Sequence, residues 1–136
     1  MTDIRRKVNN SLILDTICKI GYHKLMNSTY QGHYSYNHPT IHSWNSSAIG
    51  VYYCGYPLQD GSLAVLYVGR AVGQGGIRGR LLEHLREELW HSITHFGYTV
   101  CNTIAEAEIL ERMEIARLQP HYNTQGKSPG LLGRSF

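Results

Sequence analysis

Tyrosine, arginine, histidine and glutamate side chains occur in the middle of the chain at spacings that suit phosphodiester chemistry. Arg80 and His84 are four residues apart, which places them one turn apart on one face of a helix. Tyr52 and Tyr67 precede them, and Glu111 follows. Hydrolysis of a phosphodiester needs a nucleophilic oxygen, stabilisation of charge on the phosphoryl oxygens and help for the leaving oxygen. These residue types can supply all three.

Each side chain has a candidate role. Arg80 can place a permanent charge on the scissile phosphate, because a guanidinium matches the phosphate geometry. Tyr52 can act as general base on a water if Arg80, Arg70 or a metal stabilises its phenolate, since its reference pKa is about 10. Tyr67 can hydrogen-bond the water or the phosphate. His84 can take a proton or orient Tyr52.

A carboxylate that holds one Mg²⁺ would supply Lewis acidity and stabilise the leaving oxygen, and Glu111 is the candidate. Mn²⁺ is expected to substitute. Taken singly, each residue also has a plainer interpretation, the tyrosines as strand aromatics and Arg80 with His84 as a solvated helix face. Zinc is a less favoured use of the histidines, because the chain has no cysteine pair at finger spacing and no H-E-x-x-H motif.

In order and spacing, the set resembles the GIY-YIG nuclease superfamily over residues 49–123. Two triplets match its name motifs, with Val in place of Ile in each: Gly50-Val51-Tyr52 and Tyr67-Val68-Gly69. The Arg80/His84 pair matches its third motif. Glu111, nine residues before the segment Pro120-His121-Tyr122-Asn123, matches the last two.

The resemblance implies a metal-dependent DNA endonuclease. It selects Glu111 over Glu108 and Glu114, which lie about a turn away on either side. It also implies that the amide of Asn123 ties the loop after the last helix back onto the site, and that Arg70 has a supporting role just after the second triplet. Arg78 is a weaker alternative to Arg80, because it lies six residues before His84.

The expected elements place these residues on an α/β (α+β) core. Hydrophobic spacing predicts helices over 3–20 and 80–91, and a capping box at Thr103 starts a third that ends near Leu118. A hairpin is expected over 49–56 and 63–69, with a third strand over 95–101. The prediction is a three-stranded, mostly antiparallel sheet flanked by helices, with an N-terminal helical extension.

Strand alternation predicts which side chains share a face of the hairpin. Tyr52 and Cys54 are expected on one face and Val51 and Tyr53 on the other. Val65 and Tyr67 are expected to share a face on the second strand. Residues 70–79, rich in glycine, are expected to form a loop.

Three regions follow: an N-terminal helix with an aromatic, His-rich arm (1–48), the catalytic core (49–123) and a tail (124–136). The arm is expected to lack regular elements after residue 21, since Pro39 would break them.

Composition narrows the class of protein. The 136 residues are 42% hydrophobic and carry a net charge of only +3, which excludes a histone-like polycation. No apolar run approaches the ~20 residues of a membrane span, and no signal peptide is recognised. Three widely spaced cysteines favour free thiols in the cytoplasm. Ten Tyr accompany only two Phe, an excess that needs explaining, because a buried phenol hydroxyl requires a partner.

Charge is unevenly distributed: residues 83–116 have a net charge of −5, and the stretches before and after them are basic. Basic stretches suit double-stranded DNA. DNA contacts are expected from the arm, the Gly-rich loop and the tail, with these candidates: Gln74, Arg78, Tyr34, Tyr36 and Lys127.

Contacts built into so small a core are similar to those of the type II restriction endonucleases of the superfamily, which act as homodimers on two-fold symmetric sites. A sequence-specific restriction endonuclease is therefore the main prediction. The alternatives are a small structure-selective or weakly specific nuclease of phage or mobile-element origin, and a non-catalytic nucleic-acid-binding module.

Overall fold

Four antiparallel strands form the sheet of this protein, whose computed structural model describes residues 29–44, 46–88 and 90–125. The strands are β1 (Tyr30–Ser35), β2 (Gly50–Pro57), β3 (Leu63–Ala71) and β4 (His95–Val100), in the order β1-β4-β2-β3. The helices are α3 (His38–Ser43), α4 (Gly76–Glu87), α5 (Ile104–Leu118) and α6 (His121–Gln125). The α+β prediction is confirmed. The predicted helix over 3–20 lies outside the described residues.

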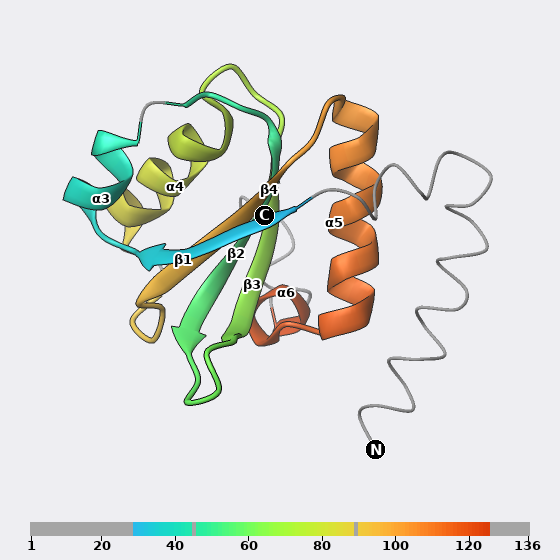
Figure 1. Cartoon of the computed structure of the whole chain (residues 1–136). Coiled ribbons are helices and arrows are strands. Elements are labelled where there is room, and N and C mark those ends of the chain that lie inside the picture. Colours follow the sequence, from blue (N-terminus) through green and yellow to red (C-terminus); the bar gives the residue numbers. More distant parts are fainter. Residues whose placement is uncertain (1–28, 45, 89, 126–136) are drawn as a thin grey trace.

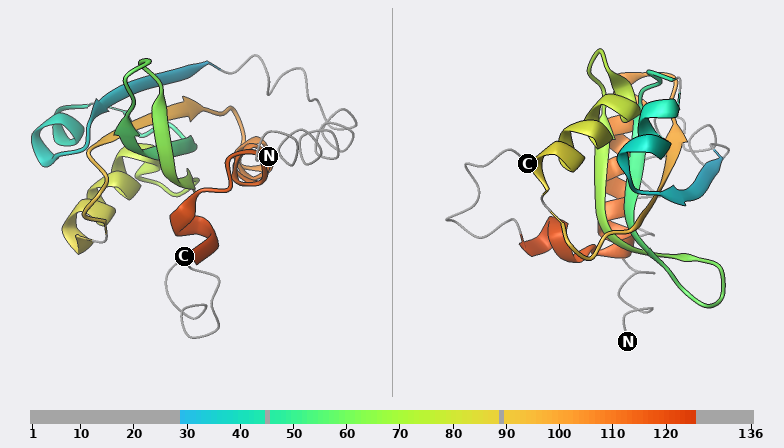
Figure 2. Two further views of the ribbon diagram at one scale, coloured as in Figure 1. Left: turned by 90° about the horizontal axis from the view of Figure 1, so that it is seen from below. Right: turned by 90° about the vertical axis from the view of Figure 1, so that its left-hand side faces the viewer.

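Both faces of the sheet are covered by helices. Helix α5 lies on one face and α3 with α4 on the other, as Figures 1 and 2 show from three directions. The α5 side encloses a core that includes Val51, Tyr53 and Val68. The α3/α4 side encloses a second core around Tyr52 and Phe96. The alternation predicted for β2 therefore holds, because Tyr52 and Cys54 belong to one core and Val51 and Tyr53 to the other.

On β3 the predicted alternation is wrong. Val65 packs against the α5-side core, whereas Tyr67 is buried in the other. The cause is a β-bulge: Tyr67 pairs with Cys54 and Val65 pairs with the next residue, Gly55, so one extra residue lies between them. Tyr67 keeps the side of the sheet that its pairing with Cys54 gives it, which is also the side of Tyr52, and the bulge turns Val65 to the opposite side.

The arm differs most from expectation. Residues 30–35 form β1, which pairs with β4 and makes the sheet four-stranded rather than three-stranded. Pro39 does not break regular structure but occupies the first turn of α3, where its missing N–H costs nothing. The Asn37 side chain caps this helix by accepting a hydrogen bond from the Thr40 N–H at 2.9 Å.

Helix α4 begins four residues earlier than predicted, so the Gly-rich loop shrinks to residues 72–75. Ile77 is fully buried, and its N–H donates to the Ala48 carbonyl at 2.9 Å. Packing therefore outweighs the low helix propensity of glycine here. The helix ends at Glu87, because Glu88 adopts a left-handed conformation with φ 52°.

Helix α5 matches its prediction closely. The Thr103 hydroxyl accepts a hydrogen bond from the Glu106 N–H at 3.1 Å, and Gln119, just before Pro120, ends the helix in a left-handed conformation. No helix among the described residues is long and apolar enough to cross a membrane. Cys54 and Cys101 are buried free thiols, and Cys18 lies outside the described residues.

Candidate active site

Tyr52 and His84 form the centre of the site. Tyr52 is fully buried on β2, and His84, on α4, is 4% exposed. Their side chains meet in a hydrogen bond of 2.8 Å between Tyr52 Oη and His84 Nε2. The plainer interpretation, in which His84 belongs to a solvated helix face, is therefore wrong for this residue, because its imidazole is buried.

The glycine of the second triplet makes room for this tyrosine. A Cβ placed on Gly69 would lie 2.5 Å from both Cζ and Oη of Tyr52, and 2.8 Å from Cε2 of Tyr67. Gly69 pairs with Tyr52 across the β2–β3 ladder. The glycine is thus required by the close approach of the phenol ring, not by an unusual backbone angle.

We expect Gly69→Ala to destabilise the protein by about 1–3 kcal/mol, because overpacking forces the buried Tyr52 ring to move. Urea unfolding measures this change. Gly73→Ala is the control, since a Cβ at Gly73 meets nothing within 4 Å. Equal stability of the two variants would contradict the packing described above.

Tyr67 completes an aromatic cluster around His84. The Tyr67 ring centroid lies 6.1 Å from that of Tyr52 and 5.8 Å from that of His84. Trp90, which sequence reasoning missed, lies 4.6 Å from His84 and 4.8 Å from Tyr67. The predicted helix over 80–91 would include Trp90. The observed helix ends earlier, at Glu87, and Trp90 lies beyond the turn at Glu88 and packs against the site.

Arg80 borders the same cluster from the preceding turn of α4. Its guanidinium pairs with Glu83, and its side chain is 38% exposed. Its positive charge and a hydrogen bond both act to lower the pKa of Tyr52. Arg80 thus interacts with the phenol and also reaches the solvent.

The pKa of Tyr52 is nevertheless raised well above 10, chiefly by burial and further by the neighbouring Tyr67 and Cys54. Arg80 favours the phenolate of Tyr52, but without a metal the desolvation of Tyr52 outweighs the charge of Arg80. Any proton that Tyr52 accepts must be matched by one that it gives away.

The pKa of His84 is lowered from 6.5 to about 4 by burial and then by the charge of Arg80, while Glu83 opposes the shift. The imidazole is therefore neutral at pH 7. In the unfolded chain it would bind a proton already near pH 6.5.

We expect this histidine to make folding pH-dependent. Its contribution is fully present above pH 6.5, and about 3 kcal/mol is lost as the pH falls to 4, because the unfolded chain binds the proton first. Urea unfolding at both ends of this range, compared with His84→Gln, isolates the effect. An equal loss of stability on acidification in the unaltered protein and in His84→Gln would contradict this expectation.

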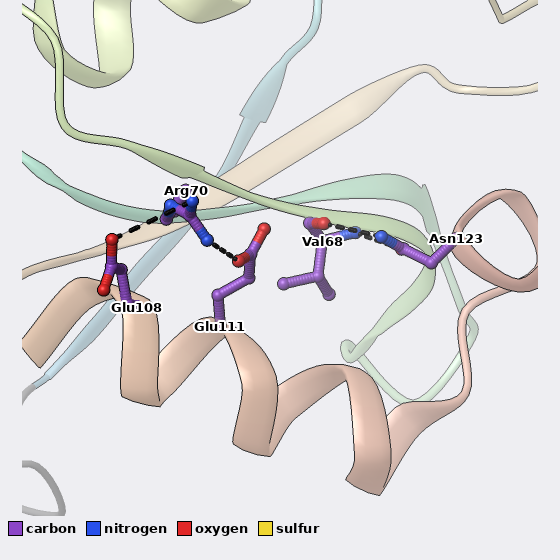
Figure 3. A network of polar contacts seen from close by, with 5 residues as sticks. All are labelled: Val68, Arg70, Glu108, Glu111 and Asn123. Carbon is purple, nitrogen blue, oxygen red and sulfur yellow. Dashed lines mark hydrogen bonds and ion pairs between the residues drawn. The ribbon is translucent and has the colours of Figure 1, made fainter. Parts of the chain in front are cut away.

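Glu111 lies on α5, beside the β3 edge of the sheet. Its Oε1 accepts a hydrogen bond from Arg70 Nη1 at 2.9 Å, and its side chain is 18% exposed. Figure 3 shows Arg70 reaching from β3 toward both Glu111 and Glu108, the latter at 3.9 Å. The negative charge of Glu111 raises the pKa of Tyr67, so its field extends to the tyrosine cluster.

Glu114, the other competing carboxylate, is in a different environment. It is 6% exposed and accepts hydrogen bonds from the Tyr53 hydroxyl at 2.9 Å and from Arg117 at 2.7 and 2.8 Å. It therefore serves the interior packing of α5 against β2. Glu111 and Glu108 alone among these three reach Arg70.

Asn123 fastens α6 to the sheet. Its Oδ1 accepts from the Val68 N–H at 2.8 Å, and its Nδ2 donates to the Val68 carbonyl at 2.9 Å (Figure 3). Val68 lies in an edge strand, so the amide satisfies both backbone groups that would otherwise lack a strand partner. This is the tie expected of Asn123.

The DNA-contact candidates are scattered. Gln74 is exposed between β3 and α4, and Tyr34 is 40% exposed on β1. Arg78 donates through Nη2 to the His42 carbonyl at 3.0 Å and so links α4 to α3. Tyr36 is half-buried and lies near Trp90, at a centroid distance of 6.3 Å. Lys127 lies outside the described residues.

The donor set around Glu111 suits Mg²⁺ better than zinc. Mg²⁺ is commonly held by one or two carboxylates, with water and substrate phosphate as the other ligands. Glu111 offers one carboxylate, of which only Oε1 is hydrogen-bonded to Arg70. Within residues 29–44, 46–88 and 90–125, no group of three or more His, Cys, Asp or Glu side chains could hold a metal ion.

Comparisons with protein-family models, with curated proteins and with solved structures give no match to this chain.

Proposed function

We propose that this protein is a metal-dependent DNA endonuclease that hydrolyses phosphodiester bonds. The observation that carries the proposal is the buried Tyr52–His84 hydrogen bond, with Tyr67 and Arg80 beside it and Glu111 at the adjoining sheet edge. A base, an anion-stabilising cation and a metal-binding carboxylate are what hydrolysis of a phosphodiester requires.

The roles follow from position. Arg80, with its exposed guanidinium, would bind the scissile phosphate. Tyr52 and His84 would take the proton of the attacking water, and Tyr67 would orient that water or the phosphate. Glu111 would hold Mg²⁺, which supplies Lewis acidity at the phosphate when bound. Arg70 would then be released from Glu111 to support the substrate.

Within this class, we propose a sequence-specific type II restriction endonuclease that acts in the cytoplasm as a homodimer on double-stranded DNA. Exposed side chains outside the cluster support this, because Tyr34 on β1 and Gln74 in the turn before α4 are available to contact DNA. A two-fold symmetric dimer on a two-fold symmetric DNA site would place one Tyr52–His84 cluster at each strand of the DNA.

Incubation of the purified chain with plasmid and Mg²⁺ tests the proposal, with EDTA as the control. Discrete bands with one sequence at every cut end are expected of a restriction enzyme. A smear, or ends without a common sequence, would support the weakly specific nuclease instead. Retained duplex binding without cleavage in Mg²⁺ or Mn²⁺ would overturn catalysis and favour the binding module.

A further inference from the structure

His84 lines a hollow on the surface of the protein. Nδ1 of His84 is buried and has no hydrogen-bond partner among the described residues, although the residue is only 4% exposed. The hydroxyl of Tyr36 is a second buried polar atom that lacks a partner there. Both residues line one hollow of about 290 Å³, whose other walls are Leu85, Glu88, Trp90, His91 and Ile93.

Water can occupy this hollow. One water needs roughly 10–15 Å³ of such space and two or more polar partners, and Nδ1 of His84 and the hydroxyl of Tyr36 are the unpartnered atoms that a water there would satisfy. His84 thus contacts a phenol at Nε2 and, with Tyr36, lines a hollow that is large enough for water.

Glu87 lies near both polar atoms. Its Oε1 is 3.9 Å from Nδ1 of His84, which is too far for a direct hydrogen bond, and its side chain is 50% exposed. Its charge also contributes to raising the pKa of Tyr36. A water in the hollow and the carboxylate of Glu87 could thus receive a proton that leaves Nδ1 of His84.

The charges around His84 disfavour a simple acceptor role. The imidazole faces Tyr52 and Tyr67 from the sheet and shares α4 with Arg80, Glu83 and Glu87, while Tyr36, Glu88 and His91 lie around the hollow. Burial and Arg80 both oppose a second proton on the ring. A ring that releases one proton as it accepts another avoids the imidazolium.

We propose that His84 passes the proton of Tyr52 through its ring into this hollow, and that Tyr36 is the positioning residue for the water at Nδ1. The inference rests on the proposed nuclease function. It requires that Tyr52 donates to Nε2 and that Nδ1 carries the hydrogen of the neutral ring.

The step balances without a free phenolate. As the attacking water forms its bond to phosphorus, the bond from phosphorus to the leaving oxygen breaks, and the leaving oxygen takes a proton from solvent. The proton of the attacking water moves to Tyr52 Oη, the Tyr52 proton moves to Nε2, and the Nδ1 proton moves to water in the hollow. Tyr52 remains a phenol and His84 remains neutral, with its tautomer exchanged. After the product leaves, Nδ1 takes a proton from the hollow, Nε2 returns one to Tyr52, and Tyr52 returns one to the solvent of the site, which replaces the proton that the leaving oxygen took.

The first test needs no substrate. Long-range ¹H–¹⁵N NMR of the full chain reports which ring nitrogen is protonated, and His84→Gln identifies the signal of His84. The proposal expects hydrogen on Nδ1 at pH 7. Hydrogen on Nε2 would overturn it, whether or not the protein cleaves DNA.

The second test is kinetic and compares Tyr36→Phe with Tyr56→Phe, a control on the exposed end of β2. Under single-turnover conditions we expect Tyr36→Phe to lower the cleavage rate roughly 10- to 100-fold with unchanged DNA affinity. Added imidazole should restore part of the rate by accepting the proton in the hollow. Tyr56→Phe should cleave like the unaltered protein and show no response to imidazole.

Three kinetic outcomes are decisive. An unchanged cleavage rate in Tyr36→Phe overturns the relay. Weaker DNA binding with an unchanged rate overturns it as well and assigns Tyr36 to DNA contact. An unaltered protein that never cleaves refutes the nuclease proposal, whereas the NMR result still decides whether His84 has the tautomer that the relay requires.

Discussion

Glu111→Ala is expected to reduce DNA cleavage by about 10³-fold or more while leaving the fold and DNA binding intact. Metal-ion catalysis contributes several kcal/mol of charge stabilisation, and each 1.4 kcal/mol corresponds to a tenfold change in rate. Glu111 is only partly exposed and its single described hydrogen bond is to the exposed Arg70, so its removal leaves no buried group unpaired. Plasmid cleavage, circular dichroism and a duplex-binding assay measure the three properties.

Glu108→Ala is the matched control, because Glu108 lies one turn earlier on α5 and also contacts Arg70, at 3.9 Å. We expect this variant to retain activity within a few-fold, since the resemblance assigns the metal to Glu111. Isothermal titration with Mg²⁺ should show weaker binding for Glu111→Ala than for Glu108→Ala. Full cleavage by Glu111→Ala would refute the metal assignment.

Tyr52→Phe has the second largest expected effect. It removes only the hydroxyl that contacts His84 at 2.8 Å, and general acid–base catalysis typically contributes 10²–10⁴-fold. We expect a loss in that range in the single-turnover cleavage rate. The folded state should also lose about 1–3 kcal/mol, because Nε2 of the buried imidazole is left without its partner, so each assay requires a check by circular dichroism.

His84→Ala distinguishes the two candidate bases. If Tyr52 and His84 act as one unit, each single variant and the double variant should lose similar amounts of rate. Normal cleavage by Tyr52→Phe together with an inactive His84→Ala would assign the general base to His84. Losses that multiply in the double variant would mean that the two residues act independently.

The elements that sequence reasoning predicted well have local causes. The β2–β3 hairpin is marked by an Asp-Gly turn in which the Asp60 carboxylate accepts from the Ser62 N–H at 2.9 Å. Helix α5 is marked by Thr103 at one end and Pro120 just beyond the other. Such signals act within a few residues and do not depend on the rest of the fold.

Elements with non-local causes were predicted poorly. Strand β1 has no hydrophobic alternation and exists through its pairing with β4. The bulge that turns Val65 to the side opposite Tyr67 arises from a register shift against β2 and leaves no trace in residue types. The start of α3 is marked by Asn37 followed by proline in the first helical turn, although proline taken alone predicts a break.

In the candidate site too, local spacing predicted some contacts, whereas contacts between distant parts of the chain could not be predicted. Helical spacing placed Arg80 and His84 on one face, and strand alternation placed Tyr52 beside Cys54. The contact between Arg70 and Glu111 joins β3 to α5 across 41 residues and could not be inferred from spacing. The depth of burial that raises the pKa of Tyr52 also depends on helices from elsewhere in the chain.

The tie between Asn123 and Val68 has a consequence for how two copies of the chain can associate. Unsatisfied N–H and C=O groups on an edge strand invite pairing with another strand. On β3 those of Val68 are already bonded to the Asn123 amide. A continuous sheet through two β3 strands would have to break both bonds, so the proposed homodimer is expected not to extend the sheet through β3, which would leave the Glu111 edge open to the proposed DNA substrate.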